Sequence, residues 1–322
     1  HRDLHSFPTR RSSDLGGQWP AALAAGTLAS RRLTGLALRL GLRLAETAGR
    51  GPLLQPRDGR WNGARAGAPS QAAPPGARPA VGYFIGCATQ HLFPGVARDT
   101  LRLLDAAGFQ ALVPSRPACC GIPLQAMGWE DMAARLARRN LDFFRDSGVT
   151  TVITDCASCA SMLSEHAAAY PGLQVRDVNE FLLQHLDRLP PRGQTASPAR
   201  ARVTYHDPCH HSRYLGITRQ PRELLSRVPG LELVEMDGAD RCCGGAGSFM
   251  LTHPHTSGVI AGWKVESIRA AAAGIVATSC PSCMLQLRRA LHRAGMGGMP
   301  VVHPVQLLAQ NLLPGQPKEK GQ

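Results

Sequence analysis

Short apolar stretches alternate with amphipathic stretches over residues 80–313 of this chain of 322 residues. The apolar stretches are too short for helices and are typical of strands that are buried on both faces of a parallel sheet. They occur twice in the same order, so we expect two sets of strands. The predicted strands lie at 81–85, 112–113, 152–154 and near 175 in the first set, and at 203–205, 231–234, 275–277 and 301–302 in the second.

The stretches between the predicted strands carry apolar residues at helical intervals. Ala97, Leu101 and Leu104 form one such stripe, and a stripe of this period predicts a helix that packs on a core. Strands that alternate with helices favour right-handed βαβ crossovers and a parallel sheet, so we expect an α/β fold. Further helices are predicted at 133–144, 217–228, 256–273 and 282–294.

Ten cysteines divide into two sets of five with the same order and nearly the same spacing. Each set has a single cysteine, then Cys-Cys-Gly and then Cys-x-x-Cys, and corresponding cysteines are 122 to 124 residues apart. A repeat this long indicates a duplicated domain, so we predict two tandem homologous Rossmann-like βαβ domains at 80–197 and 198–313. The first set is Cys87, Cys119, Cys120, Cys156 and Cys159, and the second is Cys209, Cys242, Cys243, Cys280 and Cys283.

The cysteine groups follow predicted strands. Ile85 precedes Cys87, and Thr154 precedes Cys156. Parallel sheets place their functional sites in the loops at the carboxyl ends of the strands. We therefore expect each half to bring five thiols together at one edge of its sheet.

The formal net charge of +13 lies mostly outside the predicted domains. Residues 16–79 hold nine arginines against only Glu46 and Asp58. A nucleic-acid-binding domain needs a basic stripe on its folded part, preferably with aromatic residues for stacking. Aromatic residues make up only 5% of the chain, so we expect no nucleic-acid partner.

The two ends of the chain are expected to lie outside the folded domains. Residues 1–15 resemble translated sequencing-adapter sequence, and we exclude them from the fold. Residues 16–79 predict a basic helical arm, with an amphipathic region at 19–48, followed by a linker rich in proline and glycine. We expect residues 314–322 to form a disordered tail. No segment has 18 predominantly apolar residues, which excludes an ordinary membrane-spanning helix.

Five thiols in one place suit three kinds of chemistry. Disulfides are disfavoured because adjacent cysteines lie too close for good geometry. A structural zinc site takes four ligands, so one thiol would be left over. Iron–sulfur ligation can use all five and is favoured. Gly121 and Gly244 would allow the backbone to approach a bulky cofactor. Helices predicted to begin after Cys159 and Cys283 would favour thiolates.

Polar residues near the cysteines have alternative roles. His206, His210 and His211 surround Cys209 in the sequence YHDPCHH. Each could ligate iron or move a proton, but we favour a shell of hydrogen bonds around the sulfurs. Asp155 and Asp207, which lie just before site cysteines, are explained by helix or turn capping.

The duplicated cysteine pattern resembles the cysteine-rich CCG domain family. That family includes the heterodisulfide reductase B subunit, the lactate-utilisation iron–sulfur proteins and the glycolate oxidase iron–sulfur subunit. The phrases GCATQHLFPGVARDTLRLLDAAGFQ, PACCGIPL, YHDPCH, RCCGGAGSF and SCPSCMLQL are most similar to the glycolate oxidase iron–sulfur subunit. The resemblance covers residues 80–312.

The resemblance implies an iron–sulfur oxidoreductase subunit that transfers electrons. It would accept them from an FAD-containing subunit that oxidises a 2-hydroxy acid, glycolate or lactate, and pass them toward a membrane quinone or another acceptor. Each five-cysteine set would hold one cluster of the [4Fe-4S] type. The resemblance also implies a cytoplasmic location, including the inner face of the membrane, and activity that depends on the flavoprotein partner.

Two features depart from the glycolate oxidase pattern. Glycolate oxidase iron–sulfur subunits begin with a ferredoxin-like domain, whose cysteine motifs are missing from this sequence. Many relatives in the glycolate group have also lost cysteines from the first half. This chain keeps all ten. The alternative is therefore a protein of the heterodisulfide reductase B type, which cleaves a disulfide at a non-cubane [4Fe-4S] cluster. Cys243 and His210 are then the candidate catalytic residues.

Overall fold

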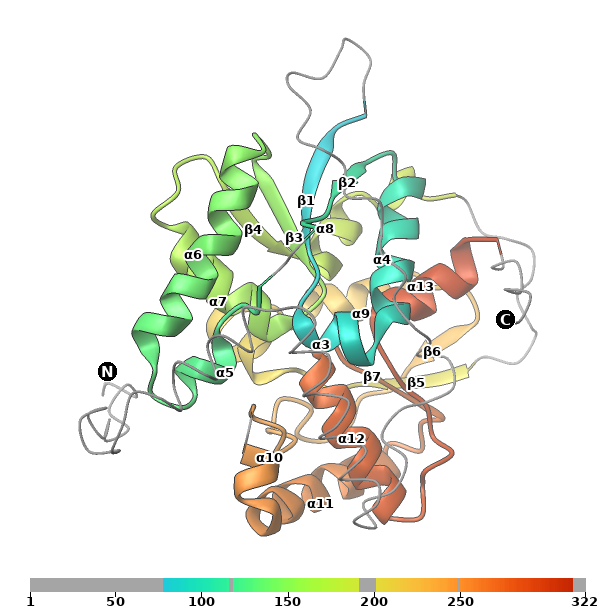
Figure 1. Cartoon of the computed structure of the whole chain (residues 1–322). Helices are drawn as coiled ribbons and strands as arrows, with labels where there is room; N and C mark the ends of the chain where they lie inside the picture. Colours follow the sequence, from blue (N-terminus) through green and yellow to red (C-terminus); the bar gives the residue numbers. More distant parts are fainter. Residues whose placement is uncertain (1–77, 116–117, 191–200, 248, 315–322) are drawn as a thin grey trace, which may run out of the picture.

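A computed structural model describes residues 78–115, 118–190, 201–247 and 249–314. The predicted arm at 19–48, all but the last two residues of the linker that follows it, and all but the first residue of the predicted tail lie outside these ranges. The described residues form two halves, each built on one parallel sheet. In Figure 1 the half that carries the first sheet lies above the half that carries the second.

Both sheets are fully parallel and have the same strand order. The first has the order β2-β1-β3-β4, and the second has the order β6-β5-β7-β8. Val152 of β3 lies opposite Gly82 of β1, and the corresponding Val276 of β7 lies opposite Thr204 of β5. The strands are β1 (Ala80–Phe84), β2 (Gln110–Leu112), β3 (Thr151–Thr154), β4 (Gln174–Asp177), β5 (Ala201–Tyr205), β6 (Leu231–Leu233), β7 (Ile275–Ala277) and β8 (Val301–Val302).

Helices cover the faces of both sheets (Figure 1). In the first half these are α3 (Cys87–Leu92), α4 (Pro94–Ala106), α5 (Ile122–Gln125), α6 (Glu130–Asp146), α7 (Ala157–Ala167), α8 (Val178–Gln184) and the 3-10 turn η4 (Leu186–Arg188). In the second half they are the π-helical turn η5 (His210–Leu215), α9 (Arg219–Ser226), α10 (Phe249–Thr252), α11 (Pro254–Ala270), α12 (Pro281–Arg293) and α13 (Pro304–Leu312).

The structure confirms the predicted α/β fold of two homologous parallel-sheet units. All eight predicted strands are present, with boundaries that differ by at most a few residues. The sequence analysis did not predict α3, α5, α8, α10, α13, η4 or η5. Of the helices in the described residues, none is long and apolar enough to cross a membrane.

The two halves pack against each other with approximate two-fold symmetry. Helix α4 of the first half packs against α13 of the second, and their counterparts α9 and α8 pack together in the same way. Likewise, α7 contacts η5, while the counterparts α12 and α3 contact each other. One hydrophobic core runs through both halves. The halves are therefore docked over a large shared surface.

Buried polar groups also cross the boundary between the halves. His211 Nε2 lies 2.9 Å from Asp177 Oδ2, and both side chains are fully buried. Asp177 Oδ1 accepts a hydrogen bond from the backbone N–H of Asn179 and so caps α8. Asn179 Nδ2 in turn donates to Ser279 Oγ at 3.0 Å, and the Ala157 N–H donates to the Ser279 carbonyl. These bonds fix the register of one half against the other.

The counterpart of Asp177 in the second half is His303, which caps α13. Its Nδ1 accepts from the N–H of Val305 at 3.2 Å, and burial lowers the pKa of His303 to about 4. Between pH 6.5 and pH 4 the unfolded chain therefore binds a proton that the folded chain does not. We expect His303 to lower the free energy of unfolding by about 3 kcal/mol as the pH falls through this range.

The variant His303→Asn tests this expectation. Asparagine is a good helix cap but does not titrate, so the variant should lose less stability than the wild type on acidification. Urea unfolding of both proteins at pH 7, 5.5 and 4.5 measures the difference. Parallel pH curves for the two proteins would show that His303 is not the group responsible.

Candidate functional site

The ten cysteines lie in loops and helix starts at the carboxyl ends of the strands. Cys87 begins α3, and Cys209 is the residue before η5. The Cys-Cys pairs lie in the loops that follow β2 and β6, and the Cys-x-x-Cys pairs lie where β3 and β7 lead into α7 and α12. Each half thus gathers its five thiols at one edge of its sheet.

Neighbouring thiols contact one another in a continuous line. In the first half the interactions run from Cys87 through Cys119, Cys120 and Cys159 to Cys156. In the second half they run from Cys209 through Cys242, Cys243 and Cys283 to Cys280. The two lines join across the boundary, where the thiols of Cys156 and Cys280 interact.

All ten cysteines are free thiols. The Sγ atoms of Cys87 and Cys119 lie 3.7 Å apart, well beyond the S–S bond length of about 2 Å. Seven of the ten are buried, while Cys87, Cys209 and Cys242 are partly accessible. The line is therefore buried in its middle and open at each end.

The close packing of the thiols makes some of them strongly acidic. Hydrogen bonds from Cys209 and Cys243 lower the pKa of Cys242 to about 2. Hydrogen bonds from neighbouring thiols likewise lower the pKa of Cys119 and Cys280 well below its usual range. A thiolate this close to other thiols raises their pKa and so opposes their ionisation, unless a cation lies among them. The donor set therefore fits a cationic metal centre bound by thiolates.

Helices α7 and α12 begin earlier than the sequence analysis predicted. Each starts directly after the first cysteine of its Cys-x-x-Cys pair, so Cys156 and Cys280 are the N-cap residues. The prediction that the helices begin after Cys159 and Cys283 is therefore wrong, whereas the range 282–294 predicted for the second helix is one residue from the start of α12 at Pro281. Both N-cap cysteines have extended backbones, and the second cysteine of each pair lies in the first helical turn. Positions three apart share one helix face, which brings the two thiols together.

The glycine of each Cys-Cys-Gly triplet is required by its surroundings. Gly121 has a φ of +110°, and a Cβ there would lie 2.6 Å from the Ala133 carbonyl oxygen of α6. Gly244 has a φ of +80°, and its Cβ would lie 2.7 Å from the corresponding Ser257 oxygen of α11. Each glycine is therefore required by its positive φ and by its close approach to a neighbouring helix, while the predicted approach to a cofactor stays a prediction.

A buried polar side chain holds the loop before each cysteine pair. In the first half Asn140 Oδ1 accepts from the Ala118 N–H, and its Nδ2 donates to the Cys119 carbonyl, both at 3.1 Å. In the second half Lys264 Nζ donates to the carbonyls of Gly238 and Ala239. The sequence analysis missed both residues. They lie 124 residues apart, so comparison of the two repeats could have found them.

The aspartates next to the cysteines do not act as caps, contrary to the prediction. Buried Asp155 accepts hydrogen bonds from the hydroxyls of Tyr83 and Thr89. Asp207 forms a two-pronged ion pair with Arg222, at 2.7 and 2.8 Å. Both carboxylates therefore fix side chains of their own half around the site.

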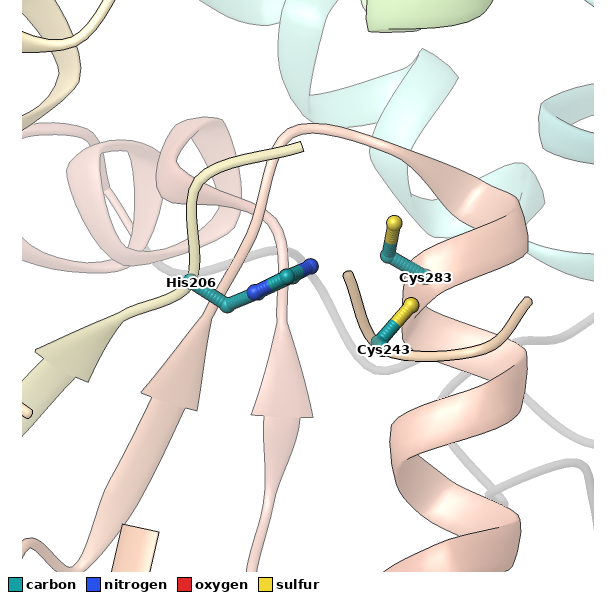
Figure 2. A group of neighbouring side chains, drawn as sticks. All are labelled: His206, Cys243 and Cys283. Atoms are coloured by element: carbon teal, nitrogen blue, oxygen red, sulfur yellow. The ribbon is translucent and has the colours of Figure 1, made fainter. Parts of the chain in front are cut away.

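The three histidines near Cys209 have different surroundings. His206 Nδ1 lies 3.1 Å from the Ala239 carbonyl oxygen, and its ring points toward the thiols of Cys243 and Cys283 (Figure 2). His210 Nδ1 lies 3.6 Å from Cys209 Sγ and 3.2 Å from Ser158 Oγ of the other half. His211 pairs with Asp177 across the boundary. Only His206 and His210 therefore lie directly against the thiols.

Substitution of the glycine in a Cys-Cys-Gly triplet should lower the free energy of unfolding by more than the loss of its positive φ alone would cause. Gly148 provides the control, because its φ is +71° but a Cβ there would meet no atom within 4 Å. We expect Gly148→Ala to lower the free energy of unfolding by about 1 kcal/mol and Gly121→Ala by about 2–4 kcal/mol, because only the latter adds a clash. Urea unfolding measures both. Equal losses would show that α6 can move aside.

Comparison with known proteins identifies both halves. The cysteine-rich domain family CCG matches residues 81–164 and 203–288. The fumarate reductase (CoM/CoB) B subunit of Methanothermobacter marburgensis is 36% identical over 235 residues, which is 73% of this chain and 46% of that protein. The probable glycolate oxidase iron-sulfur subunit of Bacillus subtilis is 31% identical over 244 residues, which is 71% of this chain and 54% of that protein.

A shorter relative aligns over nearly its whole length. Lactate utilization protein A of an Exiguobacterium species is 26% identical over 238 residues, which is 71% of this chain and 94% of that protein. By contrast, the chain spans only about half the length of the methanogen and Bacillus relatives. Among solved structures, a putative Asp/Glu racemase from Yersinia pestis aligns with 72% of this chain over 96% of its own length. The TM-score is 0.34 and the identity is 15%, so the likeness is weak.

Proposed function

This chain belongs to the cysteine-rich CCG domain family, and from that premise we propose that each half binds one iron–sulfur cluster and that the protein carries electrons within an oxidoreductase complex. The observation that carries the proposal is the gathering of two equivalent sets of five free thiols at two sheet edges. When bound, such clusters accept and release single electrons.

The chain's own residues suit this cofactor. Cys87, Cys119, Cys120, Cys156 and Cys159 would hold one cluster, and Cys209, Cys242, Cys243, Cys280 and Cys283 the other, both of the [4Fe-4S] type. Clusters need thiolate donors. The pKa of Cys242 is lowered to about 2 by its neighbouring thiols, while the pKa of Cys209 and Cys283 is raised, so a bound cation is needed to ionise the full set. The buried residues around the thiols exclude water and so help to set the reduction potential.

The contact between the two thiol lines supports transfer from one half to the other. The interacting thiols of Cys156 and Cys280 lie at the boundary, and Ser158 Oγ lies 3.6 Å from Cys280 Sγ across it. Electrons entering at one half therefore have a short route to the other. Cys87 and Cys209, the partly exposed residues at the two ends of the line, mark where electrons would enter and leave.

The names of the relatives suggest the source of the electrons. One is named as a glycolate oxidase subunit and another as a lactate utilization protein. We propose that an FAD-containing partner oxidises a 2-hydroxy acid to the 2-oxo acid and releases two electrons and two protons. The chain passes the electrons, one at a time, to a quinone or another acceptor. Activity with the hydroxy acid would then require the partner, and a quinone acceptor would place the complex at the inner membrane face.

A second function is favoured by the completeness of both thiol sets and by the relative named as the B subunit of a fumarate reductase (CoM/CoB). In this function a disulfide substrate is reduced to two thiols by two electrons and two protons at the second half. Cys209 and Cys242 are partly accessible there. His210 lies against Cys209 at 3.6 Å and is placed to pass a proton, and Cys243 adjoins them.

The metal content of the full chain, purified without oxygen, tests the cofactor. We expect about eight irons and a similar amount of acid-labile sulfide per chain. Cys283→Ser should lower both by roughly half because it removes one ligand of the second set. The matched control, Ser282→Ala in the same helical turn, should leave them unchanged. Zinc without iron in the wild-type protein would contradict both redox functions.

The reaction of the reduced protein with a small disulfide separates the two functions. We expect the dithionite-reduced chain to keep its reduced absorption spectrum when 2-hydroxyethyl disulfide is added, because the electron-transfer function needs a protein partner. Free thiol measured with a chromogenic reagent gives the readout. Rapid thiol release that is lost in Cys243→Ser would favour the disulfide reductase instead.

A further inference from the structure

The two halves differ at a buried position beside the thiols. Tyr83 of β1 and Tyr205 of β5 are counterparts, since both are fully buried and both bond the residue before a Cys-x-x-Cys pair. The next residue is Phe84 in the first half and His206 in the second, with exposures of 0% and 1%. An apolar ring in one half is thus replaced by a ring with a nitrogen donor in the other.

The hydrogen bonds of His206 fix which ring nitrogen carries its proton. Nδ1 lies 3.1 Å from the Ala239 carbonyl oxygen, and a carbonyl can only accept. Nδ1 therefore carries the hydrogen, and Nε2 carries a free lone pair. Nε2 is buried and has no hydrogen-bond partner, so its lone pair is left unsatisfied among the described residues.

That lone pair points at two thiols of the second set. The ligand atoms of His206, Cys243 and Cys283 all lie within 4.8 Å of one another, and all three residues are buried. Figure 2 shows the imidazole ring directed from the end of β5 toward the two sulfurs. Because Nε2 lacks a hydrogen, it cannot donate to a cluster sulfur. A metal ion would satisfy the Nε2 lone pair. Metal-ligating histidines usually donate their other ring N–H to a carbonyl or carboxylate, as Nδ1 does here.

A buried cation adds a second difference between the halves. Lys264, which is 2% exposed, donates to the Ala239 carbonyl that also holds His206. Its counterpart in the first half is the uncharged Asn140, which holds the equivalent loop. The second half therefore has both an additional neutral donor and an additional positive charge near its thiols.

We propose that His206 Nε2 is a protein ligand of the iron centre in the second half, which makes this centre different from the all-cysteine centre of the first half and gives it the higher reduction potential. The inference rests on the proposed function. Where the neutral imidazole takes the place of one thiolate on iron, the centre carries less negative charge, and a nearby cation favours the reduced state, so both differences raise the potential. Electrons therefore collect in the second half.

The test uses the full chain loaded with iron and sulfide, and electron spin-echo envelope modulation detects nitrogen bound to the paramagnetic centre. We expect one strongly coupled ¹⁴N in the wild type, and a ¹⁵N pattern after labelling with ¹⁵N-histidine. His206→Phe, which copies the first half, should abolish the coupling and lower one of the two midpoint potentials. Lys264→Asn should lower the same potential but keep the coupling.

Two controls assign the nitrogen. His303→Asn removes a buried histidine outside the thiol line and should leave the coupling intact, as should His210→Ala. If the coupling persists in His206→Phe, or is lost in His210→Ala instead, the proposal is overturned. If His206→Phe does not fold, the wild-type protein labelled with ¹⁵N-histidine still tests the proposal. A full iron content without any coupling to histidine nitrogen would overturn the proposal. A chain that binds no iron overturns the proposed function itself.

Discussion

The crowding of ten thiols into one line is the constraint on which the rest of the structure depends. Sulfurs in contact cannot all ionise without a cation among them, so their environment must favour a bound metal. The middle of the line, at Cys156 and Cys280, lies on the boundary between the halves. The site is therefore complete only when two separately built sheet edges are docked in one register. Buried polar bonds such as Asp177–His211 hold that register.

The fold could be predicted from the sequence because its signals are local. Apolar runs followed by amphipathic stripes identified the strands and the long helices, and the repeated cysteine spacing revealed the duplication. Helices α8 and α13 were missed because they are short and their start signals are single residues, Asp177 and His303. Asp155 and Asp207 were misassigned because their partners, Tyr83 and Arg222, come from distant or separate elements.

The composition of the candidate site was also predictable, but its connections were not. Spacing showed that each half would collect five thiols, since the carboxyl ends of parallel strands meet at one edge. It could not show that Cys156 meets Cys280, because periodicity contains no information on how two sheets dock. Nor could it separate His206 from its two neighbours in YHDPCHH, since only the Ala239 carbonyl determines where the imidazole proton lies.

The paired helix contacts at the boundary have an evolutionary consequence. Contacts of α4 with α13 and of α9 with α8 are reciprocal, as in a symmetric dimer in which one surface meets a copy of itself. A single-domain ancestor with these surfaces would have assembled as such a dimer, with two identical centres. Two such copies joined in one chain can change independently of each other. Two identical protomers carry the same residue at equivalent positions. They could not have had the differences between Phe84 and His206, or between Asn140 and Lys264.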